Sequence, residues 1–424
     1  MWGKVKFSIL MTLILPLLGF SQGNDTLYIE YCYKLLYQNW PTLKNDSLYS
    51  QSSLYKSKNI SSAYLPQIGF NAQATYQNDV TSVTLPFPGI KIDSPSKDQY
   101  KATLDVNQLI FDAGLTNSRK KLESSNSLID KQQIVIDINS KKEQLNNLFF
   151  NIMLLHETEN LQFTLQSKLK EKLSVLQSGV TNGIITESEL FALQAELLKT
   201  DQLIIEIQTS RNGLLSSLSK FIGQEIPKNI KLGYESKQFA FTENILRPEI
   251  ELFNLNKSRI NASENISKKS LLPKLYGFGQ AGYGRPGLNM LNNDFQTFYI
   301  VGAKLSWTPW DWNQSSRDRK VMEIQKEIIS NQQEAFVKAI NIQTENEITT
   351  INKMEELLKK DAEIINLREK ITIASSSKLA NGTIRSSDYI DDVTAENQAK
   401  IEMKKHQIQI LFAKFNYLVI KGLI

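Results

Sequence analysis

Few side chains in this sequence combine the types and the spacing that chemistry requires. The two histidines, His156 and His406, lie in helical patterns with no cysteine or carboxylate at metal-ligand spacing. They are better explained as ordinary helix residues than as metal ligands or acid–base groups. The single cysteine, Cys32, cannot form an intrachain disulfide. The sequence therefore predicts a protein that is not an enzyme and that uses no metal or cofactor.

The segment GFGQAG, with Gly277, Gly279 and Gly282, has the glycine spacing of a dinucleotide-binding loop. That loop binds a nucleotide only where a helix follows and points its N-terminus at the pyrophosphate. Here the chain continues as YGRPG, which does not begin a helix. We interpret these glycines as positions that relieve crowding in a β-strand.

Two Asn-Gly pairs, Asn182-Gly183 and Asn381-Gly382, interrupt long helical patterns 199 residues apart. The same offset superposes Phe111-Asp112 on Trp310-Asp311, and no gap is needed over more than a hundred residues. A fixed offset over such a length indicates an internal duplication. The two Asn-Gly pairs therefore occupy the same place in two copies of one unit.

The elements that position these pairs are long helices. Residues 115–181 contain no proline, and their leucines form a narrow stripe typical of a coiled coil. At about 1.5 Å per residue, this helix is a rod of about 100 Å. Its counterpart from Asn313 to Asn381 contains neither glycine nor proline. The pairs predict hairpin tips near residues 180–184 and 379–384, where glycine ends one helix and Thr186 or Ser386 caps the next.

Before each rod the sequence alternates between apolar and polar residues, as β-strands do. Residues 69–77, 100–107 and 299–307 alternate strictly, and a fourth strand, around residues 275–284, alternates less cleanly. We expect β-hairpins over about residues 66–110 and 273–309. Aromatic residues near the strand ends fit a membrane interface better than a core. They are Tyr76, Tyr100, Trp307, Trp310 and Trp312.

Four amphipathic strands suit a membrane β-barrel but cannot close one. The smallest membrane barrels have about eight strands, and an open sheet in lipid leaves backbone groups unpaired at its edges. Each unpaired group costs several kcal/mol. Closure therefore requires further copies of the chain.

The first residues and the charge balance limit where the protein works. Residues 1–21 have the basic start, the apolar core of about twelve residues and the small residues of a secretory signal peptide. The apolar core is short for a membrane helix, which needs roughly twenty residues. The net charge is only +5, and acids and bases are interspersed along the chain rather than clustered. This balance predicts no nucleic-acid binding.

These features together resemble the TolC-type outer membrane efflux proteins, or outer membrane factors. The resemblance rests on the opening DTLYIEYCYKLLYQNWPTL, the LP before each hairpin, the NG tips and the LSKFIG at residues 218–223. It covers the mature chain and implies a mainly α fold with a membrane β-barrel portion. The implied structural repeats are residues 22–223 and 224–424, each with a helix, a β-hairpin and a long helical hairpin. The implied assembly is a homotrimer with one twelve-stranded barrel and an α-helical periplasmic tunnel.

The resemblance also implies that the protein is a passive exit duct in the outer membrane of a Gram-negative bacterium. Such a duct serves tripartite efflux or type I secretion. The implied partners are outer membrane lipid, a periplasmic adaptor protein and an inner membrane pump of RND, ABC or MFS type. The alternative is a non-transporting periplasmic coiled-coil scaffold, which would not need amphipathic strands.

Two sets of residues receive roles by the resemblance. Asn182, Gly183, Asn381 and Gly382 at the tips would dock the adaptor. Asp388 and Asp391 would narrow the tunnel mouth, since they lie three residues apart on one helix face. The other reading of these aspartates, negative charge that complements the start of a helix, stays open.

Overall fold

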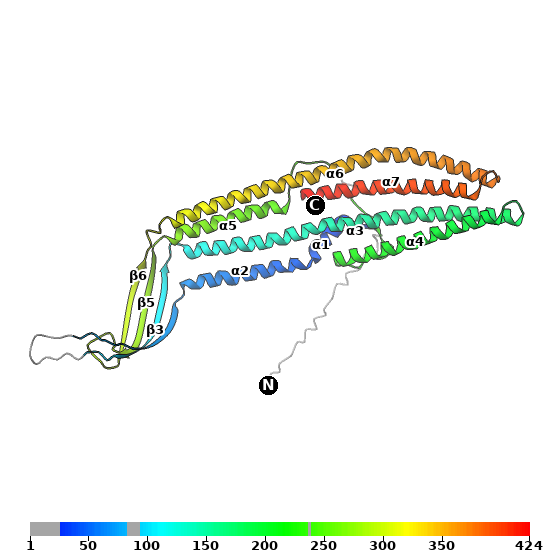
Figure 1. Ribbon diagram of the computed structural model, residues 1–424. Coiled ribbons are helices and arrows are strands. Elements are labelled where there is room, and N and C mark those ends of the chain that lie inside the picture. Colours follow the sequence, from blue (N-terminus) through cyan, green and yellow to red (C-terminus); the bar gives the residue numbers. More distant parts are fainter. Residues whose placement is uncertain (1–25, 83–93, 236–238) are drawn as a thin grey trace, which may run out of the picture.

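The chain forms a long helical body with a β-sheet at one end (Figure 1). The computed structural model describes residues 26–82, 94–235 and 239–424. The expected signal peptide at residues 1–21 and part of the first hairpin loop lie outside the described residues. Among the residues described, no helix is both long and apolar enough to cross a membrane.

The two halves of the chain have matching long helices. The predicted rod at residues 115–181 is confirmed, because α3 has these bounds, and α6 has the same length of 67 residues. The returning helices α4 and α7 contain 36 residues each. All four bounds agree with the offset of 199 residues. The helices are α1 (Ile29–Asn39), α2 (Asn45–Ser61), α3 (Leu115–Thr181), α4 (Glu187–Ile222), α5 (Pro248–Ser270), α6 (Gln314–Ala380) and α7 (Ser386–Lys421).

The predicted strands form one antiparallel sheet. Its order is β2-β3-β5-β6, so the two hairpins pair through β3 and β5, while β2 and β6 are its edges. The strands are β2 (Gln67–Tyr76), β3 (Asp98–Phe111), β5 (Lys274–Arg285) and β6 (Gln296–Ser306). A separate parallel pair, β1 (Thr26–Tyr28) with β4 (Lys231–Gly233), lies beside the middle of the rods.

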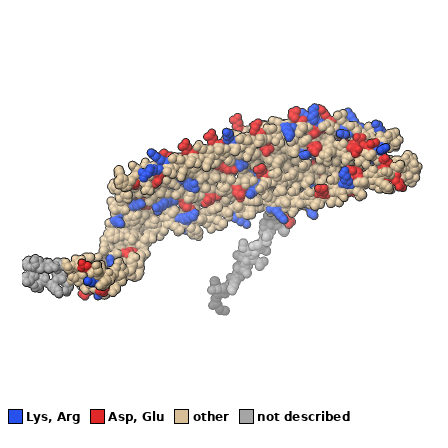
Figure 2. Space-filling model, in the orientation of Figure 1, with Lys and Arg blue, Asp and Glu red and all other residues tan. Residues whose placement is uncertain are grey.

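The helices lie side by side in one layer (Figure 1). Near the sheet the order of contacts is α6, α5, α3, α2, and near the tips it is α6, α7, α3, α4. Helix α6 is therefore one edge of the layer, and α2 and α4 share the other. Lysines, arginines, aspartates and glutamates mix along the visible face of the rods (Figure 2).

An aspartate fixes the junction between strand and rod in each copy. The Asp112 carboxylate accepts hydrogen bonds from the Thr116 N–H at 2.6 Å, the Gly114 N–H at 2.9 Å and the Tyr64 hydroxyl at 2.6 Å. Burial opposes ionisation, but these hydrogen bonds outweigh it and lower the Asp112 pKa to about 2. In the second copy Asp311 accepts the Ser315 N–H at 2.8 Å. The offset of 199 residues therefore relates the capping aspartates of the two rods as well as the lengths of the rods.

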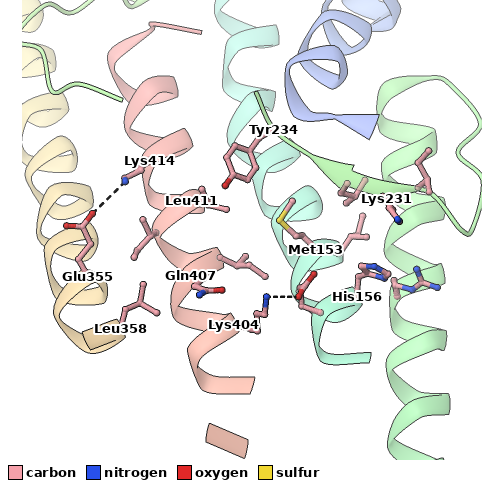
Figure 3. Close-up of a pocket in the computed structure, with 17 residues that line it drawn as sticks. Met153, His156, Lys231, Tyr234, Glu355, Leu358, Lys404, Gln407, Leu411 and Lys414 are labelled. Carbon is pink, nitrogen blue, oxygen red and sulfur yellow. Dashed lines mark ion pairs between the residues drawn. The ribbon is translucent and has the colours of Figure 1, made fainter. Parts of the chain in front are cut away.

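The main core lies midway along the rods, where α1 packs between α3 and α4. Next to it, β4 crosses the helices and leaves a cavity of about 630 Å³ (Figure 3). Apolar side chains such as Met153 and Leu411 line the cavity. Two ion pairs flank it, Lys404 with Glu157 at 3.0 Å and Lys414 with Glu355 at 3.6 Å.

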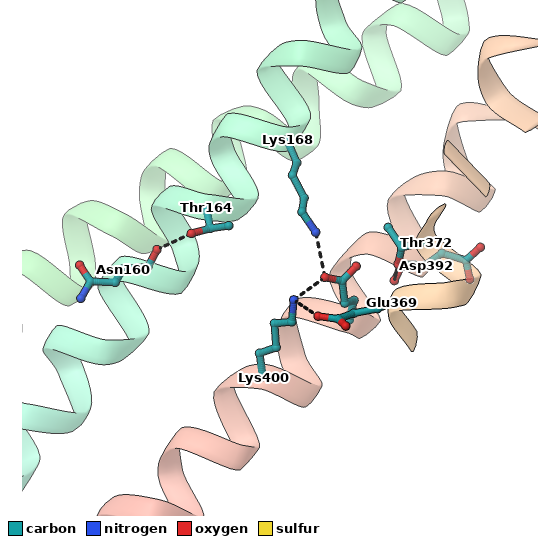
Figure 4. Close-up of polar contacts among 8 residues, drawn as sticks. Asn160, Thr164, Lys168, Glu369, Thr372, Asp392 and Lys400 are labelled. Atoms are coloured by element: carbon teal, nitrogen blue, oxygen red, sulfur yellow. Dashed lines mark hydrogen bonds and ion pairs between the residues drawn. The ribbon is translucent and has the colours of Figure 1, made fainter. Parts of the chain in front are cut away.

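A buried carboxylate joins three helices closer to the tips (Figure 4). Glu396 of α7 is 3% exposed and lies 2.8 Å from the Lys168 ammonium of α3 and 2.7 Å from that of Lys400. Lys400 also pairs with Glu369 of α6 at 2.7 Å. Burial alone would raise the Glu396 pKa, but hydrogen bonds from Lys168, Lys400 and Thr372 lower it to about 2. This cluster connects the two helical hairpins.

Glu396→Gln should therefore destabilise the protein by roughly 1–3 kcal/mol at neutral pH, because both lysines lose their shared anion. The folded pKa lies below the ordinary value of 4.5, so the contribution of Glu396 is complete above about pH 4.5 and is lost as the pH falls toward 2. Urea unfolding of both proteins across this range measures the difference. The control is Glu369→Gln, whose side chain is half-exposed and contacts only Lys400, and a smaller effect is expected there. Equal, pH-independent effects of the two changes would contradict this account.

Candidate functional site

The hairpin tips lie together at the end of the rods far from the sheet (Figure 1). Asn182 and Asn381 end their helices, and Gly183 and Gly382 follow, each with φ of 69°. A Cβ at either glycine would meet no atom within 4 Å. The left-handed backbone, rather than lack of space, therefore explains these glycines.

The predicted caps of the returning helices are correct only in part. Thr186 is the N-cap of α4 as predicted, although its side chain makes no cap hydrogen bond. Ser386 is the first residue of α7 rather than its cap, so that prediction is wrong. Instead, the Glu189 carboxylate of α4 accepts the Ser386 N–H of α7. The first hairpin therefore helps to cap the returning helix of the second, an interaction that no local pattern predicts. A cavity of about 440 Å³ lies between them.

Asp388 and Asp391 are both exposed near the second tip. The Asp388 carboxylate accepts the Arg385 N–H at 3.1 Å, as a helix-start residue does. Asp391 makes no hydrogen bond or ion pair among the described residues. Their neighbour Asp392 differs, because it is half-buried and accepts the Ser375 hydroxyl. The two aspartates predicted to narrow a tunnel mouth are thus the exposed ones, and that role stays a prediction.

The predicted interface aromatics fall at opposite ends of the sheet. Tyr76 and Tyr100 lie at its outer end, next to the loops, since Tyr76 pairs with Asp98 and Ala74 with Tyr100. Trp307, Trp310 and Trp312 lie at the helical end, after β6 and before α6, and are 58–78% exposed. Two aromatic levels separated by the strands have the arrangement of membrane girdles.

The two faces of the sheet differ in chemistry. One face carries exposed apolar side chains, such as Phe70, Leu104 and Val301. On the other, the Asp105 carboxylate accepts hydrogen bonds from the side chains of Asn71 at 2.6 Å and Gln280 at 2.5 Å. Such a sheet fits lipid on one side and water on the other.

The glycines of the GFGQAG segment lie within β5, as expected from the sequence. A Cβ at Gly282 would come within 2.5 Å of Phe298 on the neighbouring strand. Gly302 is similarly covered by Phe278. These two glycines therefore give room to rings on the polar face. Gly279 has open space around it, and crowding does not explain it.

The other reactive side chains have structural surroundings. His406 of α7 lies 2.7 Å from the Asp361 carboxylate of α6, between two packed helices. His156 lines the cavity beside β4 (Figure 3). Arg211 lines it too and pairs with Glu159 at 3.1 Å. The cavity escaped sequence analysis because β4 has only three residues and no alternation. Within the described ranges, no group of three or more histidines, cysteines, aspartates or glutamates could hold a metal ion.

Comparison with known proteins identifies the fold of the chain and a family match for its first half. Residues 32–224 match the model of the outer membrane efflux protein family. No curated protein matches the chain. Among solved structures, the outer-membrane channel OprN is 13% identical, with a TM-score of 0.67 over 93% of this chain and 89% of that one.

Two further channels are similar to this chain. The CmeC outer membrane channel of Campylobacter jejuni has 13% identity and a TM-score of 0.63 over 93% of this chain and 85% of its own. The MtrE outer membrane channel of Neisseria gonorrhoeae has 13% identity and a TM-score of 0.63 over 93% and 89%. At such identities the likeness shows the fold. The match to the outer membrane efflux protein family, a family of the outer membrane, covers residues 32–224, the first of the two repeats.

Proposed function

We propose that three copies of this chain form a passive exit duct through the outer membrane. In this assembly three sheets close one barrel and the helical layers close a tunnel into the periplasm. The tips meet an adaptor protein, and an inner membrane pump delivers the cargo. The observation that carries the proposal is that both layers of the chain, helices and strands, end in unsatisfied edges.

The helical edges expose apolar stripes. Seven of the eight exposed large apolar residues of α6 fall within an arc of about 80° when each residue turns 100°. The seven are Val321, Ile324, Ile328, Ile342, Ile364, Leu367 and Ile371. Of the interior helices, α5 and α7 expose no large apolar side chain, and the 67 residues of α3 expose only Leu128, Phe163 and Val175. A stripe confined to the edge indicates burial against another chain.

The opposite edge offers a matching surface. On α4, Phe191, Leu198 and Ile205 are exposed and repeat every seven residues. A stripe on one edge and a different stripe on the other favour head-to-tail association, which closes into a ring. The strands support the same symmetry, since β2 and β6 have unpaired backbone at opposite edges of the sheet.

The strands also weigh against the scaffold alternative. A soluble coiled-coil scaffold gains nothing from a sheet with an exposed apolar face, and such a sheet would aggregate in water. An apolar face between two levels of Tyr and Trp instead fits insertion in lipid.

Native mass spectrometry in detergent should find a trimer. Ile324→Glu with Ile371→Glu should reduce it strongly, since each buried isoleucine contributes about 1.5–3 kcal/mol and both are exposed in one chain. Ser330→Glu, on the opposite side of α6 and exposed, is the control. A stable soluble monomer of the unmodified protein would exclude the proposed assembly.

Gly183→Val with Gly382→Val should abolish export while trimer and membrane insertion persist. A β-branched residue is strained at φ of 69° and obstructs end-on contact with an adaptor. Gly213→Val is the matched control, because this glycine lies within α4 and its Cβ would also meet open space. Export that survives the double change would place docking elsewhere.

Asp388→Asn with Asp391→Asn should raise single-channel conductance in planar bilayers and weaken block by divalent cations. Three copies would bring six carboxylates to one opening, which favours cations. Asparagine keeps the hydrogen-bond acceptor for the Arg385 N–H, so thermal stability should hardly change. Asp388→Glu with Asp391→Glu, which keeps the charge, is the control. Unaltered conductance and block in the asparagine variant would leave these residues as helix-start groups only.

A further inference from the structure

The structure gathers the positive charge of the protein at one level. Four segments that are far apart in sequence meet where the helices join the sheet, namely residues 52–64, 111–124, 261–274 and 310–323. They contain eleven lysines and arginines against six aspartates and glutamates, a net charge of +5. The whole chain also has a net charge of +5, so the remainder is neutral. Charges that are interspersed along the sequence are therefore separated in space.

Six of these side chains begin the two rods, and we call them the basic collar. In α3 they lie from the fifth to the seventh residue, and in α6 from the fourth to the seventh. Figure 2 shows lysines and arginines at this end of the helical body. The collar consists of Arg119, Lys120, Lys121, Arg317, Arg319 and Lys320.

Helix stability does not account for the collar. Helix starts favour acidic side chains, and the first turns of α3 and α6 contain none. Lys268 and Lys269 near the collar are different, because they lie in the last turn of α5 and complement its dipole. The collar residues lie near the N-termini of α3 and α6, where the positive end of the helix dipole disfavours basic side chains.

Ion pairs do not account for the collar either. Among the described residues, none of its six side chains pairs with a carboxylate, and Arg317 donates only to the Trp312 carbonyl at 2.9 Å. Arg119, Lys121 and Lys320 are exposed. Two of the three positions repeat at the offset of 199 residues, Lys120 with Arg319 and Lys121 with Lys320. Six cations without anionic partners, three at the start of each rod, leave positive potential directed at an external anion.

The position of the collar identifies that anion. Lys121 and Lys320 lie six residues after the start of their helices, a rise of about 9 Å. The tryptophans at 307, 310 and 312 lie just before α6. Tryptophan girdles mark the level of lipid headgroups, and long basic side chains reach several ångströms toward that level.

We infer that the basic collar binds the headgroups of anionic phospholipids in the periplasmic leaflet of the outer membrane. Phosphate diesters supply the negative charge that the six cations lack, and they occur at this level of the bilayer. In a trimer the collar becomes a continuous ring that fixes the depth of the barrel. The inference rests on the proposed membrane insertion of the sheet.

The test uses the purified full chain, reconstituted in bilayers of equal parts phosphatidylethanolamine and phosphatidylglycerol and then extracted in mild detergent. Native mass spectrometry counts the retained lipids. The unmodified protein should retain phosphatidylglycerol at least about tenfold over phosphatidylethanolamine, since each basic residue near an anionic surface contributes severalfold. Extraction in about 1 M salt, where the Debye length is about 3 Å, should remove most of this preference.

The variant carries Lys120→Gln, Lys121→Gln, Arg319→Gln and Lys320→Gln, and its preference should fall to within about twofold. The control carries Lys170→Gln, Lys172→Gln, Lys338→Gln and Lys353→Gln, which remove the same charge from the rods far from the sheet, and it should keep the preference. An unselective unmodified protein, or a variant as selective as the control, overturns the inference. So does collar-dependent binding of isolated peptidoglycan without lipid preference.

Channel recording in pure phosphatidylethanolamine separates the two proposals. The collar variant should conduct like the unmodified protein there, because the role proposed for the collar is lipid binding and not conduction. An unmodified protein that conducts without lipid preference overturns the collar alone, and one that never conducts overturns the duct.

Discussion

The rest of the structure depends on backbone and apolar groups that one chain cannot satisfy. The edge strands β2 and β6 have no partner on one side, and in lipid no water is available to take the place of one. The helical layer also has exposed edges, since α6 carries one stripe of exposed apolar side chains and α4 carries another. In the proposed assembly, one rotation supplies a neighbouring copy to the edges of both layers. This agreement between two independent layers is stronger support for a closed ring than either layer alone.

Because the long helices of the two repeats have equal lengths, a ring of these chains would have all its hairpin tips at one level. Because α3 and α6 have the same length, and α4 and α7 also match, the two tips of a chain finish at the same level. The copies differ where the second half has the extended segment with β4 and the single helix α5 in place of α1 and α2. These differences lie at mid-rod and near the sheet. Thus the tips keep the symmetry of the repeat, while the middle of the layer does not.

The sequence predicted those features that depend on neighbours along the chain. The bounds of α3 follow from the absence of proline up to the Asn182-Gly183 pair, and the strands follow from alternation. Features that join distant segments could not be predicted. Glu396 meets Lys168 from another helix 228 residues away, and Glu189 caps Ser386 of the other hairpin. The predicted cap at Ser386 was wrong because Arg385 is the N-cap of α7, and Glu189 of the other hairpin accepts the Ser386 N–H.

The same limitation explains the charge pattern. Along the sequence acids and bases are interspersed, yet the collar end carries a net charge of +5, while the tip segments 177–193 and 376–392 together carry −3. About 100 Å of helix separates the two ends, many times the Debye length of about 8 Å at physiological salt. The two potentials therefore do not influence each other. A long rod can hold an acidic surface for one environment and a basic surface for another, and neither reduces the field of the other. The length of the rods, which contain no proline, therefore separates the two charged ends as well as setting the dimensions of the fold.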